Sequence, residues 1–156
     1  ASDEPGVLST HLHADGSYES LLYVDGSVAD GYDNPAAGPA VTRMQGNEVF
    51  KIAVRTLGRI VDETLDANNM TREDLTWLIP HQANMRIIDA TANRMGVGKE
   101  KVMINIQKYG NTTSGTIPLC FWEWEDKFKK GDNIVISAFG GGFTWGSIYL
   151  RWAYDS

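Results

Sequence analysis

The sequence contains a single cysteine, Cys120, and no long apolar run. One cysteine excludes an internal disulfide framework and suits a reducing compartment. No stretch approaches the roughly 18–20 consecutive apolar residues that cross a bilayer, and no signal-peptide pattern opens the chain. We therefore expect a cytoplasmic protein with no membrane partner.

Positive charge is also scarce, since 14 Lys and Arg against 20 Asp and Glu give a net charge of -6. This balance argues against a nucleic-acid partner, because binding to phosphates needs clustered cations. Local cations remain. Lys51, Arg55 and Arg59 recur every four residues on one predicted helix, and Arg86 and Arg94 lie on a second. They indicate either solvated helix faces or a docking surface for an acidic partner.

The 156 residues, 42% of them hydrophobic, fit one α/β domain with a substantial core. The clearest helix is predicted from Asn47 to Ala67, where apolar residues recur at three- and four-residue steps. Strands that alternate with helices imply βαβ crossovers and a mostly parallel sheet, with a last strand added antiparallel through a Gly-rich turn. We expect further helices over 82–95 and 112–128, and strands over 76–79, 102–106, 133–139 and 147–154.

The first 43 residues lack this alternation. Segments 7–13 and 20–24 alternate like strands, and Asp15-Gly16 between them favours a hairpin. Residues 25–43, which include two prolines, predict an extended surface loop. The single domain, 1–156, therefore divides into a hairpin and loop over 1–43 and a βαβ core over 44–156.

His81 follows a predicted strand and precedes a helix, and Asn111 stands at a similar junction. Ligand-binding groups gather beyond the carboxyl ends of strands in open α/β sheets. Two hydrogen-bond donors there could converge on one carbonyl oxygen and stabilise an enolate. The structural alternatives are a packed histidine at a strand end and an asparagine that caps a helix.

Three other features lead to weaker predictions. The Gly-rich run 140–146 lacks the spacing of a phosphate or dinucleotide loop, and indicates either a flexible turn or backbone that approaches a ligand. Cys120 lies mid-helix, away from any activating group, so it reads as a small buried hydrophobe and not as a nucleophile. His11 and His13 share a strand face without a third ligand, so no metal site is expected.

Three motifs in this order strongly resemble the carboxyl-terminal half of the β-ketoacyl-acyl-carrier-protein synthase III family. They are Pro80-His81-Gln82-Ala83-Asn84, Tyr109-Gly110-Asn111-Thr112 and Ala138-Phe139-Gly140-Gly141-Gly142. The similarity extends over essentially the whole chain. It implies a thiolase-like fold of α/β/α layers with a mixed, mostly parallel sheet, of which this chain would be the second of two duplicated halves.

The resemblance implies a decarboxylative Claisen condensation of an acyl-CoA primer, expected to be acetyl-CoA, with malonyl-acyl-carrier protein, which starts fatty-acid synthesis. Catalysis by enolate stabilisation falls on His81 and Asn111, whereas the nucleophilic cysteine belongs to the missing amino-terminal half. The remaining implied roles are active-site lining and oxyanion binding (Phe139, Gly141), pantetheine binding (Gly46, Asn47, Phe50, Asn84) and carrier-protein docking (Lys51, Arg86, Arg94).

No cofactor is implied, since CoA and carrier-protein thioesters are the substrates. The implied partners are acyl carrier protein, acyl-CoA, the missing amino-terminal half and, in the full-length family, a second copy in a homodimer. The chain begins at Ala1 and not at a methionine, which agrees with a piece of a longer enzyme. Because the implied nucleophilic cysteine belongs to the missing half, we expect the chain to be inactive alone. The alternatives are half of a chalcone-synthase-like ketide-forming enzyme, and a non-catalytic module that docks acyl carrier protein.

Overall fold

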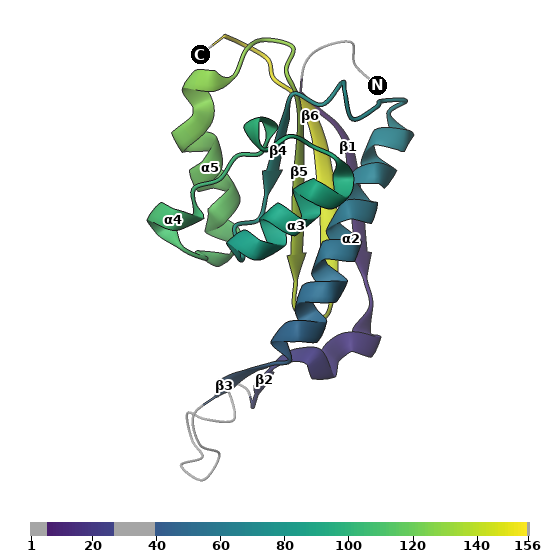
Figure 1. The fold of residues 1–156 in the computed structure, drawn as a ribbon, viewed down its shortest axis with the longest axis vertical. Coiled ribbons are helices and arrows are strands. Elements are labelled where there is room, and N and C mark those ends of the chain that lie inside the picture. Colours follow the sequence, from purple (N-terminus) through teal and green to yellow (C-terminus); the bar gives the residue numbers. More distant parts are fainter. Residues whose placement is uncertain (1–5, 27–39, 156) are drawn as a thin grey trace.

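The main sheet of the computed structural model, which describes residues 6–26 and 40–155, has four strands in the order β1-β6-β5-β4 (Figure 1). β4 pairs with β5 in parallel, whereas β6 is antiparallel to both of its neighbours. β1, β4 and β5 therefore run in one direction, which confirms the mixed, mostly parallel sheet. The strand bounds are Gly6–Ala14 (β1), Trp77–Pro80 (β4), Asn133–Gly140 (β5) and Thr144–Arg151 (β6).

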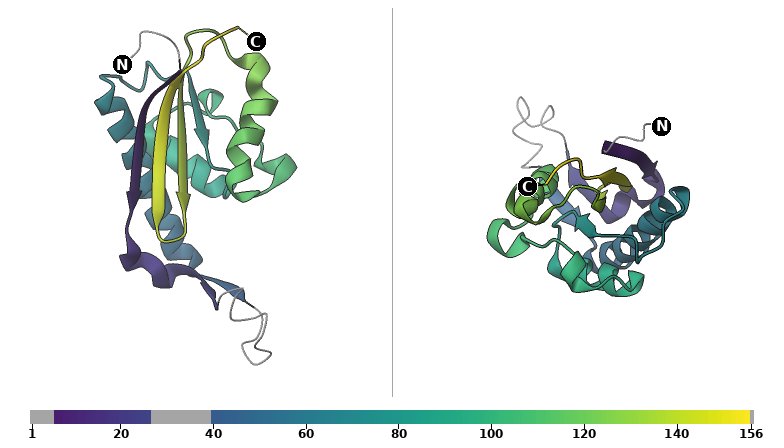
Figure 2. Two further views of the ribbon diagram at one scale, coloured as in Figure 1. Left: turned by 180° about the vertical axis from the view of Figure 1, so that it is seen from behind. Right: turned by 90° about the horizontal axis from the view of Figure 1, so that it is seen from above.

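Helices lie on both faces of the sheet. Helices α2 (Gly46–Ala67) and α3 (Met85–Met95) cover one face, and α5 (Thr116–Trp124) lies on the other (Figures 1 and 2). This arrangement confirms the α/β/α layers. No helix in the described part of the chain is both long and apolar enough to cross a bilayer. The other helical segments are short: η1 (Gly16–Leu21), η2 (Lys99–Lys101), α4 (Ile106–Tyr109), η3 (Thr113–Gly115) and η4 (Glu125–Lys127).

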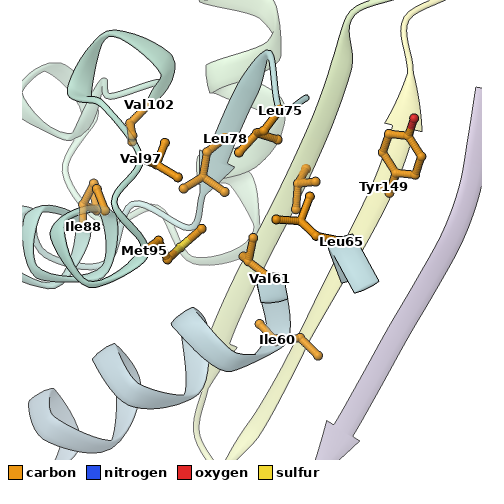
Figure 3. Close-up of a cluster of buried hydrophobic side chains, with 12 residues drawn as sticks. Ile60, Val61, Leu65, Leu75, Leu78, Ile88, Met95, Val97, Val102 and Tyr149 are labelled. Carbon is orange, nitrogen blue, oxygen red and sulfur yellow. The ribbon is translucent and has the colours of Figure 1, made fainter. Parts of the chain in front are cut away.

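The apolar stripe predicted for α2 forms one side of the core. All six residues of the stripe are buried: Val49, Ala53, Leu57, Ile60, Val61 and Leu65. Figure 3 shows Ile60, Val61 and Leu65 of this stripe in one cluster with Leu78 of β4, Met95 of α3 and Tyr149 of β6. A second cluster, which includes Ile79 and Phe128, lies beneath α5. Each large apolar side chain so buried contributes roughly 1.5–3 kcal/mol, so the sheet is held from both faces.

Local capping sets the ends of α3. The Asn84 side chain accepts a hydrogen bond from the Arg86 N–H at 2.8 Å, so the helix begins at Met85 and not at the predicted Gln82. Gly96 ends the helix at φ 65°, the left-handed conformation expected of a C-cap glycine. The predicted C-cap is therefore confirmed.

The predicted hairpin over 7–13 and 20–24 is wrong. β1 pairs with β6 at the far end of the sequence, and η1 follows it because Asp15 caps that turn through the Ser17 N–H at 2.9 Å. The second segment forms β2 (Leu22–Asp25), which pairs with β3 (Val41–Met44) in a separate two-stranded sheet. The predicted loop over 25–43 is thus partly strand, and its residues 27–39 lie outside the described residues.

The predicted strand over 102–106 is also wrong, since only Val102 forms a parallel bridge, with Leu78. Gln82 explains the difference, because its buried side chain takes the backbone groups that a strand would use. Its Oε1 accepts from the Asn105 N–H at 3.1 Å, and its Nε2 donates to the Met103 carbonyl at 3.2 Å. The helix predicted over 112–128 is shorter as well, with η3 and η4 at its ends.

We predict that Gly146→Ala destabilises the protein by about 1–3 kcal/mol through overpacking. A Cβ at Gly146 in β6 would lie 2.7 Å from Leu12 Cδ2 and 2.8 Å from the His11 carbonyl oxygen in β1. Chemical denaturation gives the change. Gly16→Ala is the matched control, since a Cβ there meets nothing within 4 Å. Equal midpoints for the two variants would contradict the close approach of β1 to β6.

Candidate active site

A cleft of about 1090 Å³ opens beyond the carboxyl ends of β4 and β5. Its walls come from the β2–β3 pair, the first turn of α2, the start of α3, the segment before α5 and the β5–β6 turn. Nine of the eleven predicted site residues line it: Gly46, Asn47, Phe50, His81, Asn84, Arg86, Asn111, Phe139 and Gly141. The structure thus brings together residues that are up to 95 positions apart in the sequence (141 minus 46).

His81 is the first residue after β4, and hydrogen bonds fix it at both ends. Its backbone N–H donates to the Ser137 carbonyl of β5 at 2.8 Å, and its Nδ1 lies 2.6 Å from Thr116 Oγ1. Burial lowers the pKa of the imidazole below its usual value of 6.5. The ring is therefore neutral at neutral pH and has one N–H to place.

Asn111 follows α4 and is exposed in the cleft wall. Its side-chain oxygen accepts a hydrogen bond from the Thr113 N–H at 3.0 Å. This tight turn holds Thr113 at φ 53°, an unusual conformation for a β-branched residue. Asn111 does not cap α5, whose N-cap is Gly115. The turn therefore fixes the side-chain amide of Asn111, whose oxygen already accepts a hydrogen bond from the protein.

The Gly-rich turn between β5 and β6 is anchored at its base. Phe143 is fully buried, and its backbone exchanges two 2.8 Å hydrogen bonds with Asp15. Its ring stacks on Tyr18, with ring centroids 5.2 Å apart, and contacts Phe139 at 4.7 Å. Phe139 and Gly141 face the cleft from either side of Gly140. The turn is therefore held by η1, which the sequence did not indicate.

The predicted docking cations are separated. The Arg86 guanidinium lies 5.3 Å from the centroid of the Phe50 ring at the cleft. Lys51, one residue further along α2, pairs with Glu48 at 2.8 Å and does not line the cleft. Arg94, in the last turn of α3, crosses α2 at Gly58, where a Cβ would lie 3.3 Å from its Cδ.

The remaining charged candidates lie on the β1 side of α2. Arg55 and Arg59 line a smaller cavity of about 230 Å³, together with His13. His11 Nδ1 and His13 Nε2 lie 3.2 and 3.0 Å from Glu63 Oε1. Among residues 6–26 and 40–155, no group of three His, Cys, Asp or Glu side chains is arranged to hold a metal ion.

Several site residues were missed from the sequence. Leu22, Thr42 and Met44 line the cleft from the β2–β3 pair. The sequence feature that could have indicated them is the alternation of apolar residues on either side of the predicted loop over 25–43. Thr116 contacts His81, and nothing in the sequence marks this hydroxyl beyond its position five residues after Asn111.

Comparison with known proteins first gives the class. The chain superposes on the crystal structure of 3-oxoacyl-[acyl-carrier-protein] synthase III from Aquifex aeolicus VF5 with a TM-score of 0.84 and 42% identity, over 97% of this chain and 46% of that one. It superposes on the priming β-ketosynthase of the R1128 polyketide pathway with a TM-score of 0.86 and 28% identity, over 99% and 47%. The fold is thus that of the thiolase-like condensing enzymes.

The family follows from the sequence comparison. Residues 65–152 match the family model described as 3-oxoacyl-[acyl-carrier-protein (ACP)] synthase III C terminal. A curated β-ketoacyl-[acyl-carrier-protein] synthase III of Alkalilimnicola ehrlichii is 51% identical over 97% of this chain and 47% of its own length. The chain belongs to the 3-oxoacyl-[acyl-carrier-protein] synthase III family as its carboxyl-terminal domain. It spans about half the length of the curated relatives it matches.

We predict that Cys120 is inert to iodoacetamide in the folded protein and reacts on unfolding. The residue is fully buried, and burial raises the pKa of its thiol to about 12. Intact mass before and after denaturation measures the modification. Rapid alkylation under native conditions would contradict both the burial and the structural role assigned to this thiol.

Proposed function

We propose that this chain is the carboxyl-terminal catalytic half of an enzyme that condenses an acyl-CoA primer with malonyl-acyl-carrier protein. Acetyl-CoA is the primer that we expect. His81 and Asn111 donate hydrogen bonds to the malonyl thioester oxygen. Gly141 contributes a backbone N–H to the oxyanion of the condensation step, and Phe139 lines the site. The product is a β-ketoacyl-carrier protein that starts fatty-acid synthesis.

One observation carries this proposal: each of the two side chains has one polar atom held by the protein and one left for a ligand. His81 uses Nδ1 at Thr116, and Asn111 uses Oδ1 at the Thr113 N–H. Within the described residues, His81 Nε2 and Asn111 Nδ2 have no protein partner, and both residues line the same cleft. Atoms so left are suited to donate to a substrate oxygen.

The chemistry needs no proton transfer from either residue in the decarboxylation. The bond between the malonyl carboxylate and its α-carbon breaks, carbon dioxide leaves, and the electron pair moves onto the thioester oxygen as an enolate. The enolate carbon then attacks the acyl group on a cysteine of the amino-terminal half, and the thiolate leaves. Each preorganised donor is worth roughly 2.7–4 kcal/mol, by analogy with the removal of one oxyanion-hole donor.

The binding roles follow the walls of the cleft. Gly46, Asn47 and Phe50 lie at the first turn of α2, and Asn84 caps α3 across from them. An extended pantetheine arm between these helices would pass both apolar surface and amide groups. A Cβ at Gly141 would meet Leu22 O at 3.7 Å, an ordinary contact, so packing within the chain does not explain this glycine. Close approach of substrate to its backbone would.

An amino-terminal half fits the part of the sheet face that α5 leaves uncovered. His11 and His13 face α2, so Leu12 between them points to the opposite face. Leu12 is 78% exposed there, and Trp122 of α5 is 71% exposed. In the view from behind in Figure 2, α5 lies beside β4, and no helix of the described chain covers β1 and β6. This apolar surface suits a partner layer, and supports the proposal that the chain is inactive without it.

The two alternative functions, a ketide-forming enzyme and a non-catalytic docking module, are not equally supported. The similarity to a priming β-ketosynthase of a polyketide pathway favours a ketide-forming enzyme as the second candidate. A non-catalytic docking module would need the basic residues and not the cleft. The tethered arrangement of His81 and Asn111 therefore argues for catalysis.

We predict that His81→Ala or Asn111→Ala, in the full-length enzyme, slows malonyl decarboxylation by about a hundredfold or more. Transfer of the primer to the nucleophile should change much less, because the two donors act on the enolate. The double variant should fall short of the summed losses, since both donors serve one oxygen. Rapid-quench assays of the two half-reactions measure both effects.

His13→Ala is the control for these variants, since His13 lies outside the cleft and bonds to Glu63. It should leave both half-reactions at the wild-type rate. Equal losses of the two half-reactions in His81→Ala and Asn111→Ala would exclude the assignment to enolate stabilisation.

We predict that Arg86→Glu raises the apparent KM for malonyl-carrier protein several-fold and leaves that for acetyl-CoA nearly unchanged. Arg86, with Lys51 and Arg94, would attract an acidic carrier over distances that salt screens within about 8–10 Å. The difference should shrink as salt rises. Lys130→Glu is the control, because it reverses the charge of an exposed residue far from the cleft. Lys130 lies just before the start of β5, whereas the cleft lies beyond the end of β5. If Arg86→Glu left the apparent KM for malonyl-carrier protein unchanged at low salt, these cations would belong only to solvated helix faces.

A further inference from the structure

The hydroxyl of Thr116 contacts the nitrogen of His81 that faces away from the proposed substrate. Thr116 Oγ1 lies 2.6 Å from His81 Nδ1, and Thr116 is only 1% exposed. Thr116 is the first residue of α5, whereas His81 follows β4. The contact therefore couples the helix on one face of the sheet to the end of β4 that borders the cleft.

Two arrangements of protons fit these atoms. In the first, the Thr116 hydroxyl donates to Nδ1, and the single imidazole proton is on Nε2. In the second, Nδ1–H donates to Oγ1, the hydroxyl donates to the Thr113 carbonyl 3.0 Å away, and Nε2 presents a lone pair to the cleft. Because burial keeps the ring neutral, it has one proton, and the arrangements differ in whether Nε2 is a donor or an acceptor.

The proposed role of His81 favours the first arrangement. The 2.6 Å separation joins Nδ1 to Oγ1 in either arrangement, but a donor to the thioester oxygen carries its proton on Nε2, which leaves Nδ1 as the acceptor. The Thr113 carbonyl also has another donor, since it accepts the Thr116 backbone N–H. It does not need the hydroxyl, whereas Nδ1 has no second partner among the described residues.

We propose that Thr116 is a positioning residue that donates its hydroxyl hydrogen to His81 Nδ1, which orients the ring and places the imidazole proton on Nε2, toward the cleft. This inference rests on the proposed function of His81 as a donor to the thioester oxygen. The tautomer itself can be measured without that function.

Thr116→Val in the full-length enzyme removes the donor and keeps the branched shape. We expect malonyl decarboxylation to fall about tenfold, the effect of one lost hydrogen bond, with a smaller change in primer transfer to the nucleophile. Thr116→Ser should restore the rate, because it returns the hydroxyl. Thr91→Val is the matched control: Thr91 is a buried threonine of α3 whose hydroxyl has no partner among the described residues, so its rate should equal that of wild type.

Nitrogen-15 NMR of histidine-labelled enzyme reads the tautomer directly, with His81→Gln to assign the signal. Wild type and Thr116→Ser should show a protonated Nε2 and an unprotonated Nδ1, and Thr116→Val should lose this preference. A protonated Nδ1 in wild type, or an unchanged His81 signal in Thr116→Val, would overturn the proposal. So would a loss of rate in Thr116→Val that Thr116→Ser fails to restore, since that indicates packing alone. If the tautomer follows Thr116 but His81→Ala leaves decarboxylation intact, the proposed function fails and the tautomer assignment stands.

Discussion

The parallel pairing of β4 with β5 continues one residue past the end of β4, and the rest of the site depends on this extension. The His81 backbone N–H donates to Ser137 at 2.8 Å, so the catalytic candidate is held by the sheet and not by a loop. Gln82, the next residue, is fully buried and fixes the segment around Asn105. A rigid strand end thus positions both the imidazole and the path of the chain toward Asn111.

The cleft is assembled from segments that are distant in the sequence because different layers end at the same edge of the sheet. α2 and α3 contribute one wall, the segment before α5 another, and the β5–β6 turn the floor between them. The paired hydrogen bonds between Asp15 and Phe143 tie that turn to the start of η1. An early segment that the sequence predicted only as a hairpin turn therefore fixes the turn that carries Gly141.

Sequence reasoning succeeded where a local rule decides the structure. The α2 stripe and the Gly96 cap follow from periodicity and backbone preference, and both are confirmed. It failed where distant pairing decides. β1 alternates like half of a hairpin, but the residues of β6 with which it pairs lie at least 130 positions away (144 minus 14). The strand expected near 104 was replaced by side-chain bonds from Gln82, which no propensity encodes. The predicted residues of the cleft were identified because they match the family resemblance. The residues of β2 and β3 that line the cleft, and Thr116, could be found only in the structure.

The strained conformation in the described chain that bears most directly on the site is that of Thr113. A β-branched residue at φ 53° costs on the order of 1–3 kcal/mol relative to an ordinary backbone. The hydrogen bond from its N–H to the Asn111 side chain offsets part of that cost. The same turn presents the Thr113 carbonyl to Thr116, whose hydroxyl then meets His81. One strained residue therefore connects the two proposed donors, Asn111 directly and His81 through Thr116. Thr113 is exposed and lies outside the core, so its strained backbone serves the geometry of the proposed site and not the packing of the domain.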